Sequence, residues 1–275
     1  MSELAKRTVF GSLFVIIVIG SILVDYWAFF AVLLITVFIG SQEVSRLLNK
    51  EKNRDIEVMT VFMAILFFIW GMFWNIISFS QMNIMFVMLF VLLFTPFFVA
   101  LFSKRHSFAK ITLSCWTSML YVALPCMILL ELYQSDAGLM IKGNKYLIIM
   151  IFALIWTNDI FAYLTGTAFG RHKLFERISP KKTIEGSLGG LVMTVVTASL
   201  VNRFWYHFMS DWQMIGMAAV VVVFGSLGDL CESMMKRQAG VKDSGNVIPG
   251  HGGILDRFDA TFMAVPFVYC YLMLL

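Results

Sequence analysis

The chain has 275 residues, of which 60% are hydrophobic and only 14% charged, and its mean hydropathy is +0.84. Soluble domains average about 45–50% apolar and about 25% charged residues, so this composition excludes an ordinary soluble enzyme. A membrane helix uses about 20 residues per crossing, so the apolar residues suffice for about eight or nine spans and leave no room for a sizeable soluble domain. The net charge of +4 is modest, and the four single cysteines predict neither a disulfide framework nor a zinc site.

Nine apolar runs follow one another along the chain. Backbone polar groups in hydrocarbon must be satisfied within their own segment, so each run is expected to be a helix. The first run follows Lys6 and Arg7, as in a signal peptide. It lacks a small-x-small cleavage site, and a second run begins directly after Asp25, so we interpret it as a retained span. The predicted spans are Thr8–Val24, Tyr26–Ser41, Val58–Ile77, Met82–Phe102, Ile111–Leu130, Tyr146–Gly166, Gly186–Val201, Met214–Leu230 and Ala260–Leu275.

Basic residues divide unevenly between the two sides on which the connections of nine helices alternate. The side of the N-terminus would carry 18 of the 21 Lys and Arg residues, and the other side only Lys142, Lys145 and Arg203. Cytoplasmic loops carry an excess of Lys and Arg, so the N-terminus is predicted to be cytoplasmic. The expected fold class is therefore an all-α integral membrane protein, a polytopic helical bundle with about nine transmembrane helices.

The two halves of the chain differ in chemistry. Residues 1–130 form helices with almost no ionisable groups, and we interpret them as N-terminal transmembrane helices that serve as a scaffold. Residues 131–275 carry the polar clusters, and they are predicted to form a C-terminal transmembrane catalytic region with loops on the cytoplasmic side.

The first two polar clusters surround the sixth run. Asp159 lies inside that run, where a carboxylate needs a partner or a water-filled cavity, although a helix-end carboxylate at the interface is the alternative. The loop 171–183 that follows is strongly basic. Two interpretations explain this loop equally well. One is attraction to anionic lipid headgroups, and the other is phosphate binding through Ser179, Lys181 and Lys182.

The third cluster begins where the eighth run ends. Helical spacing places five polar residues on one face, so carboxylates suited to a cation lie within a turn or two of cations suited to phosphate. These residues are Asp229, Glu232, Ser233, Lys236 and Arg237.

A glycine-rich loop then leads into the last helix. In Pro-Gly-His-Gly-Gly the backbone can approach a ligand closely and point amide groups at an anion. Asp256 and Arg257 follow as an adjacent metal ligand and phosphate clamp. Carboxylates recruit Mg²⁺ through oxygen, and phosphates complete its coordination. A P-loop is absent, so the pattern favours metal-assisted charge stabilisation over a covalent enzyme intermediate.

The segment from Ser233 to Asp259 resembles the signature of the phosphatidate cytidylyltransferase (CDP-diacylglycerol synthase) family: S-x-x-K-R, four residues, K-D-x-G, and then P-G-H-G-G-x-x-D-R-x-D. The dipeptides Asn158–Asp159 and Gly228–Asp229 and the loop Ser179–Thr183 also resemble family segments. The resemblance covers about Trp156 to Asp259.

This resemblance implies transfer of CMP from CTP to phosphatidic acid in phospholipid biosynthesis, with release of pyrophosphate, by in-line attack of the lipid phosphate on the α-phosphorus. It implies Mg²⁺ as cofactor and leaves room for a second, monovalent cation. The implied catalytic residues are Asp229, Lys236, Asp256 and Arg257, with Asp229 and Asp256 as metal ligands. The implied substrate-binding residues are Ser179, Lys181, Lys182, Ser233, Arg237, Lys242, Asp243, Gly250, His251, Gly252 and Gly253. Asp159, Glu232 and Asp259 are expected to hold these residues in position without contacting the substrates themselves.

Two other functions fit part of the pattern. A CTP-dependent polyprenol or dolichol-type lipid kinase needs the same charges, but it transfers the γ-phosphoryl group and releases CDP. A transporter is suggested by Asp159 and Asp229, yet it predicts charges near the membrane midplane, whereas these gather at one side. The expected partners are CTP, phosphatidic acid and the lipid bilayer, with no nucleic acid, and a homodimer fits the resemblance. The expected location is the bacterial cytoplasmic (inner) membrane, with the active site facing the cytoplasm.

Overall fold

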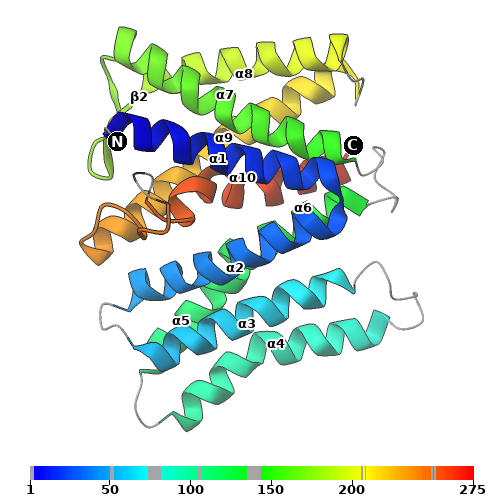
Figure 1. The fold of residues 1–275 in the computed structure, drawn as a ribbon, viewed down its shortest axis with the longest axis vertical. Coiled ribbons are helices and arrows are strands. Elements are labelled where there is room, and N and C mark those ends of the chain that lie inside the picture. Colours follow the sequence, from blue (N-terminus) through cyan, green and yellow to red (C-terminus); the bar gives the residue numbers. More distant parts are fainter. Residues whose placement is uncertain are drawn as a thin grey trace. The chain divides into compact units, whose positions relative to one another are not determined.

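The computed structural model describes residues 3–49, 53–73, 82–103, 107–134, 144–205, 207, 209–248, 250 and 252–275. These residues are almost entirely helical (Figure 1). The elements are α1 (Glu3–Val24), α2 (Tyr26–Leu48), α3 (Arg54–Met72), α4 (Met82–Phe102), α5 (Phe108–Thr117), the π-helical turn η2 (Ser118–Ala123), α6 (Leu124–Gln134), α7 (Lys145–Phe169), β1 (Lys173–Phe175), β2 (Ser179–Thr183), α8 (Ile184–Phe204), α9 (Asp211–Ala239) and α10 (Leu255–Met273).

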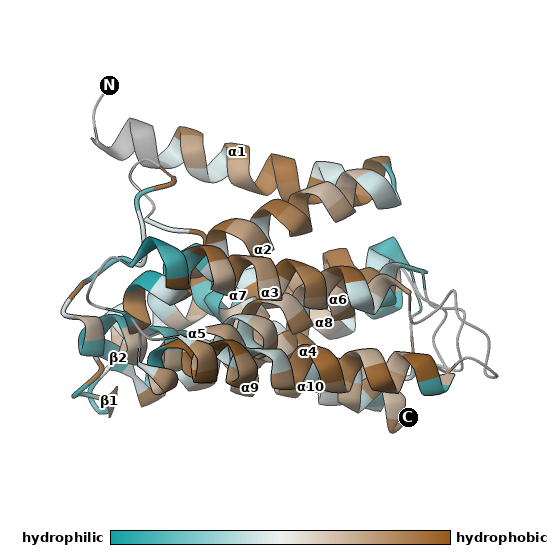
Figure 2. Ribbon diagram, turned by 90° about the horizontal axis from the view of Figure 1, so that it is seen from below, coloured by the Kyte–Doolittle hydropathy of each residue, from teal (hydrophilic) through white to brown (hydrophobic). Residues whose placement is uncertain are grey.

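The predicted all-α polytopic membrane fold is confirmed. Each predicted span overlaps a helix, and α5, η2 and α6 form one continuous span. Among the described residues, seven helical stretches are long and apolar enough to cross a membrane, and α1 contributes a shorter apolar stretch. Hydrophobic residues run along the helices, whereas polar residues gather mainly at helix ends and loops (Figure 2). The orientation of the N-terminus stays a prediction.

Polar residues at the connections stop one helix and start the next. Asp25 is the only residue between α1 and α2, and its side chain accepts a hydrogen bond of 2.6 Å from the Ala28 amide. Asn53, Asn144 and Thr183 cap α3, α7 and α8 in the same way. Such caps satisfy backbone N–H groups that the first turn of a helix leaves without partners. The predicted split between the first two spans at Asp25 is therefore confirmed.

The chain divides into two compact units, each described here by itself. Unit 1 comprises Met1–Glu131 and Gln238–Arg257, and unit 2 comprises Leu132–Arg237 and Phe258–Leu275. The first break lies next to the predicted boundary at residue 130, but the segment 238–257 groups with the N-terminal helices. The assignment of scaffold and catalytic roles to the two halves stays a prediction.

In unit 1, α2, α3, α5 and η2 pack together, while α4 lies against α3 and α5 and α1 against α2. A buried hydrogen bond of 2.8 Å from Asn49 Nδ2 to Ser114 Oγ ties the end of α2 to α5. Gly40 allows close packing of α2, since a Cβ atom there would lie 3.0 Å from Val122 of η2 and 3.6 Å from Leu255. This face of α2 therefore reaches the start of α10 within the same unit.

In unit 2, α7 and α8 lie side by side and are joined by the β1–β2 hairpin (Figure 1). Three glycines of α8 let the two helices approach closely, as small residues do at membrane helix interfaces. A Cβ atom on Gly190 would lie 3.1 Å from Ala162 Cβ, and one on Gly186 would lie 3.1 Å from Gly166 Cα. The rings of Phe224 and Phe267 stack with centroids 3.6 Å apart, so α9 packs on α10.

The basic loop 171–183 contains a short antiparallel hairpin. Lys173 pairs with Thr183 and Phe175 pairs with Ser179. The Glu185 carboxylate accepts backbone hydrogen bonds from Arg171 at 3.1 Å and from His172 at 3.2 Å. Because both strand ends are tied to the first turn of α8, the basic residues of the hairpin are held in a fixed place.

Candidate functional site

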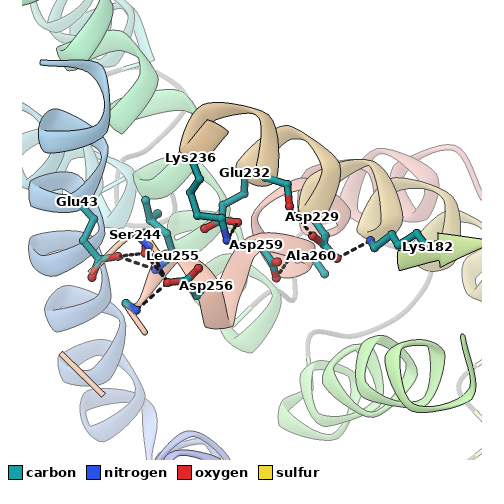
Figure 3. A network of polar contacts seen from close by, with 12 residues as sticks. Glu43, Lys182, Asp229, Glu232, Lys236, Ser244, Leu255, Asp256, Asp259 and Ala260 are labelled. Carbon is teal, nitrogen blue, oxygen red and sulfur yellow. Dashed lines mark hydrogen bonds and ion pairs between the residues drawn. The ribbon is translucent and has the colours of Figure 1, made fainter. Parts of the chain in front are cut away.

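The carboxylate of Asp229 on α9 forms an ion pair with Lys182 on β2. Lys182 Nζ bonds Asp229 Oδ2, and Ser233, one turn further along α9, donates to Asp229 Oδ1 at 3.2 Å. The two charged side chains are 28% and 31% exposed, so a ligand can reach them. Two segments that the sequence indicated separately thus meet at one point of unit 2 (Figure 3).

Asp259 on α10 adds a second carboxylate beside Asp229 (Figure 3). It interacts electrostatically with the like charges of Asp229 and Asp159 and with the opposite charge of Lys182. Gly228 makes this approach of α9 and α10 feasible, because a Cβ atom there would overlap the Asp259 carbonyl oxygen. Like charges held this close together favour the binding of a cation.

Glu232 and Lys236 form a second ion pair on α9, with 2.5 Å between Oε2 and Nζ. The Glu232 side chain is fully buried and the Lys236 side chain is 12% exposed. The polar residues predicted on one face of α9 therefore form two separate ion pairs: Asp229 pairs with Lys182 of the hairpin, and Lys236 pairs with Glu232. A buried charge of this kind needs its partner, since taking both out of water is costly.

Asp256 is held by the loop that precedes it, within unit 1. Its Oδ2 atom accepts hydrogen bonds from Ser244 N at 2.9 Å, Ser244 Oγ at 2.9 Å and Gly253 N at 2.8 Å. Gly252 has a φ of +84°, a left-handed conformation that favours glycine, and a Cβ atom there would approach Asp256 Oδ2 to 2.5 Å. The glycine-rich sequence is thus needed to fold the loop around the carboxylate.

The sequence reasoning missed Glu43, which lies on α2 in the half interpreted as chemically quiet. Its side chain is buried, and its carboxylate bonds Ser244, Ile254 and Leu255. The predicted span ended at Ser41, whereas α2 continues to Leu48, so Glu43 lay outside the predicted spans. Apolar residues recur beyond Glu43, and this signal would have placed an ionisable residue inside a helix. An ionisable residue inside a membrane helix is a reason to suspect a functional site.

The other predicted residues occupy mostly exposed positions. Ser179 is partly buried on β2. His251 lies outside the described residues. The exposed members of the predicted set are Asp159, Lys181, Arg237, Lys242, Asp243, Gly250 and Arg257.

Carboxylates at Asp229 and Asp256 have the chemistry that Mg²⁺ requires. Among the described residues, no group of three or more His, Cys, Asp or Glu side chains is arranged to hold a metal ion. Mg²⁺ sites at phosphates fit that finding, because this ion is usually bound through one or two carboxylates, water and substrate phosphates. The ammonium group of Lys182 already places a positive charge at Asp229 Oδ2. Each of the two carboxylates, taken by itself, thus offers the oxygen ligands that suit the ion.

Comparison with known proteins identifies the family. Residues 5–275 match the model of the cytidylyltransferase family, so the chain belongs to that family.

Named relatives come from staphylococci. A "Phosphatidate cytidylyltransferase" of Staphylococcus aureus (strain COL) is 40% identical over 169 residues, which is 62% of each chain. One of Staphylococcus epidermidis (strain ATCC 12228 / FDA PCI 1200) is 38% identical over the same length. One of Staphylococcus saprophyticus is 37% identical over 186 residues, 68% of this chain and 67% of the relative. The match thus spans 62% of the length of the first two relatives.

Proposed function

We propose that this protein is a phosphatidate cytidylyltransferase, which transfers CMP from CTP to phosphatidic acid and yields CDP-diacylglycerol and pyrophosphate. Membership of the cytidylyltransferase family and the names of the staphylococcal relatives support the proposal. The structural observation that carries it is the contact of Lys182 with Asp229, because it joins a phosphate-binding group and a metal-binding group in one place.

The chemistry asks for positioning and charge neutralisation. A phosphate oxygen of phosphatidic acid attacks the α-phosphorus of CTP in line, a new P–O bond forms, and the bond to the β-phosphate breaks to release pyrophosphate. Negative charge gathers on both phosphates as they approach, so catalysis depends on fixed positive groups around them. No covalent enzyme intermediate is needed.

The positions of Lys182 and Lys236 support their proposed roles. Lys182 is held by Asp229 within reach of a phosphate, and the partly exposed pair can exchange partners when substrate enters. Lys236 is positioned by Glu232. Asp229 and Asp256 are the proposed Mg²⁺ ligands. Bound Mg²⁺ would polarise the α-phosphoryl group and neutralise charge on the leaving pyrophosphate.

The remaining roles are substrate contacts. We assign phosphate and nucleotide binding to Ser179, Lys181, Lys182, Ser233, Arg237, Lys242, Asp243, Gly250, His251, Gly252, Gly253 and Arg257. Two features of the loop support this assignment: the turns at Gly250 and Gly252 have φ values of +76° and +84°, and the basic side chains next to the loop are exposed. Positive-φ turns direct successive amide groups to one side, which suits an anion.

The decisive experiment uses purified protein in detergent with Mg²⁺, CTP labelled on either the α- or the γ-phosphate, and both phosphatidic acid and a polyprenol as lipid acceptors. Cytidylyl transfer moves the α-label into lipid and releases the γ-label as pyrophosphate. A lipid kinase would instead move the γ-label into lipid and leave the α-label in CDP. Label that stays in CTP with both preparations would refute both enzymatic functions.

We also propose that the protein lies in the bacterial cytoplasmic membrane with this site facing the cytoplasm. The bacterial relatives and the predicted bias of basic residues support this. Single cysteines at Lys181 and Lys145, in a chain whose four cysteines are replaced by serine, test it. An impermeant maleimide should label the first only in inside-out vesicles and the second only in intact spheroplasts, and the reverse pattern would refute the orientation.

Two further proposals concern assembly and ions. We propose a homodimer, which light scattering of the detergent-solubilised protein tests directly. We propose a monovalent cation beside Mg²⁺, which predicts higher activity in K⁺ than in an equal concentration of tetramethylammonium. A monomeric mass or equal activities would refute them.

A further inference from the structure

The Glu43 carboxylate of α2 receives three hydrogen bonds from the loop that leads into α10, and all of these residues belong to unit 1. Oε1 accepts from the Ile254 amide at 3.0 Å. Oε2 accepts from the Leu255 amide at 2.9 Å and from the Ser244 hydroxyl at 2.8 Å. The Glu43 side chain is only 1% exposed, so these bonds form out of contact with water, where they are strong.

Glu43 does for α10 what a capping residue does for other helices. α10 begins at Leu255, and the residue before it, Ile254, has no polar side chain to bond the first amide groups. The Glu43 carboxylate takes two of these amides from a distant part of the chain. A carboxylate at a helix N-terminus is also favoured by the helix dipole.

The surroundings leave a space shaped for this carboxylate. A Cβ atom on Gly253 would overlap the carboxylate oxygens of Glu43, and one on Gly245 would lie 3.0 Å from its Cδ atom. Gly40, one turn earlier on α2, lets the helix approach Leu255. Glycines on both sides of the contact are therefore matched to one buried acid.

Ser244 connects this carboxylate to Asp256. Its hydroxyl oxygen lies 2.8 Å from Glu43 Oε2 and 2.9 Å from Asp256 Oδ2, and it is buried. The hydroxyl has one hydrogen to give, so it is shared between the two acids. Figure 3 shows Glu43, Ser244, Leu255 and Asp256 in one connected network. A movement of the Glu43 carboxylate would therefore also move Asp256, because the Ser244 side chain contacts both.

We propose that Glu43 is a positioning residue of the active site: it anchors the loop 244–255 to α2 and thereby fixes the direction in which Asp256 presents its carboxylate. The inference rests on the proposed function, in which Asp256 acts on the phosphates. Glu43 itself touches no substrate; it acts through Ser244 and the amides at the start of α10.

The test compares Glu43→Gln with Glu57→Gln in the same unit. The amide of Glu43→Gln keeps the size of the side chain but turns one acceptor into a donor that faces an N–H or O–H group. Glu57 is a partly buried partner of the half-exposed Arg46, so the control makes the same chemical change at an ion pair of the same helical unit. Glu43→Asp keeps both acceptors on a shorter chain and should recover part of what Glu43→Gln loses.

Two measurements separate positioning from mere structural support. In Glu43→Gln, kcat should fall about 10- to 100-fold with the KM for CTP nearly unchanged, as expected when a group behind a ligand is lost. Hydrogen exchange of substrate-free protein should rise in peptides covering 244–257 and stay unchanged in α7 and α8. The Glu57→Gln control should match the wild type in both.

The failures are distinguishable. Wild-type kcat in Glu43→Gln, or unchanged exchange at 244–257, would overturn the inference. So would an activity loss that disappears once the amount of folded protein is counted by size-exclusion chromatography. If Glu43→Gln does not fold, Ser244→Ala tests the same link, with the same kcat split expected at about tenfold. Absence of CDP-diacylglycerol synthesis in the wild type would refute the proposed function instead, and the exchange measurement would still decide whether Glu43 anchors the loop.

Discussion

Replacing Asp229 by asparagine separates the chemical role of this residue from its structural one. Asn keeps the shape and still accepts a hydrogen bond from Ser233, but it loses the charge that pairs with Lys182. Both side chains of the ion pair are about 30% exposed, so solvent screens their attraction. Exposed pairs contribute about 0–1 kcal/mol, and we therefore expect the free energy of unfolding to fall by no more than about 1 kcal/mol.

The effect on turnover should be far larger. A proposed metal ligand contributes several kcal/mol of charge stabilisation in the transition state. A loss of about 4 kcal/mol corresponds to a decrease of about 1000-fold in kcat, since each 1.36 kcal/mol is tenfold. The predicted signature is thus a nearly inactive protein that unfolds at nearly the wild-type temperature.

The assay measures transfer of α-labelled CMP to phosphatidic acid alongside thermal unfolding in the same detergent. Asp211→Asn provides the matched control, because Asp211 lies in the first turn of the same helix and accepts a bond of 3.3 Å from Asn202. It should keep wild-type kcat. A kcat for Asp229→Asn within tenfold of the wild type would refute the ligand assignment.

Three more substitutions have defined expectations. Lys182→Ala should raise the KM for CTP or phosphatidic acid about tenfold, because one charge-assisted phosphate contact is lost. Lys145→Ala, at the first residue of α7, should leave both KM values unchanged. A Lys182→Ala protein with wild-type KM values for both substrates would contradict this prediction. Glu232→Gln leaves the largely buried ammonium group of Lys236 without the charge of its carboxylate partner, so the free energy of unfolding should fall by about 3 kcal/mol. Thermal unfolding measures this, and an unchanged melting temperature would count against it. Gly252→Ala should cost about 1–2 kcal/mol of backbone strain and should also disturb Asp256, so both stability and activity should fall; full activity would show that the turn is not needed.

Local sequence signals accounted for most of the fold. Spans were located from unbroken hydropathy, because a lipid-exposed segment must be apolar and must satisfy its own backbone. The turn at Asp25 followed from one carboxylate between two apolar runs, and it caps α2. The hairpin at 173–183 was not predicted, since its strands are held by Glu185 of the next helix rather than by a strand-like pattern of their own.

The candidate site was predicted in its residue types but only partly in its contacts. Asp229 and Ser233 sit one turn apart on a helix, so their contact follows from spacing alone. The sequence does not tell which hairpin lysine pairs with Asp229, because Lys181 and Lys182 are adjacent residues of the same type. Only the register of β2 brings Lys182 to α9. The pairing of Lys236 with the buried Glu232 likewise depends on which side of α9 is covered.

By itself, the sequence determined that this is a polytopic helical membrane protein, and it predicted that the site residues lie between Asn158 and Asp259. Hydropathy and motif spacing are local properties, so they can be read without knowing what lies across from each residue. Only the tertiary structure decided that Glu43 of α2 bonds the loop before α10. That contact joins residues more than 200 positions apart, and no periodicity in the chain encodes which buried acid meets which amide.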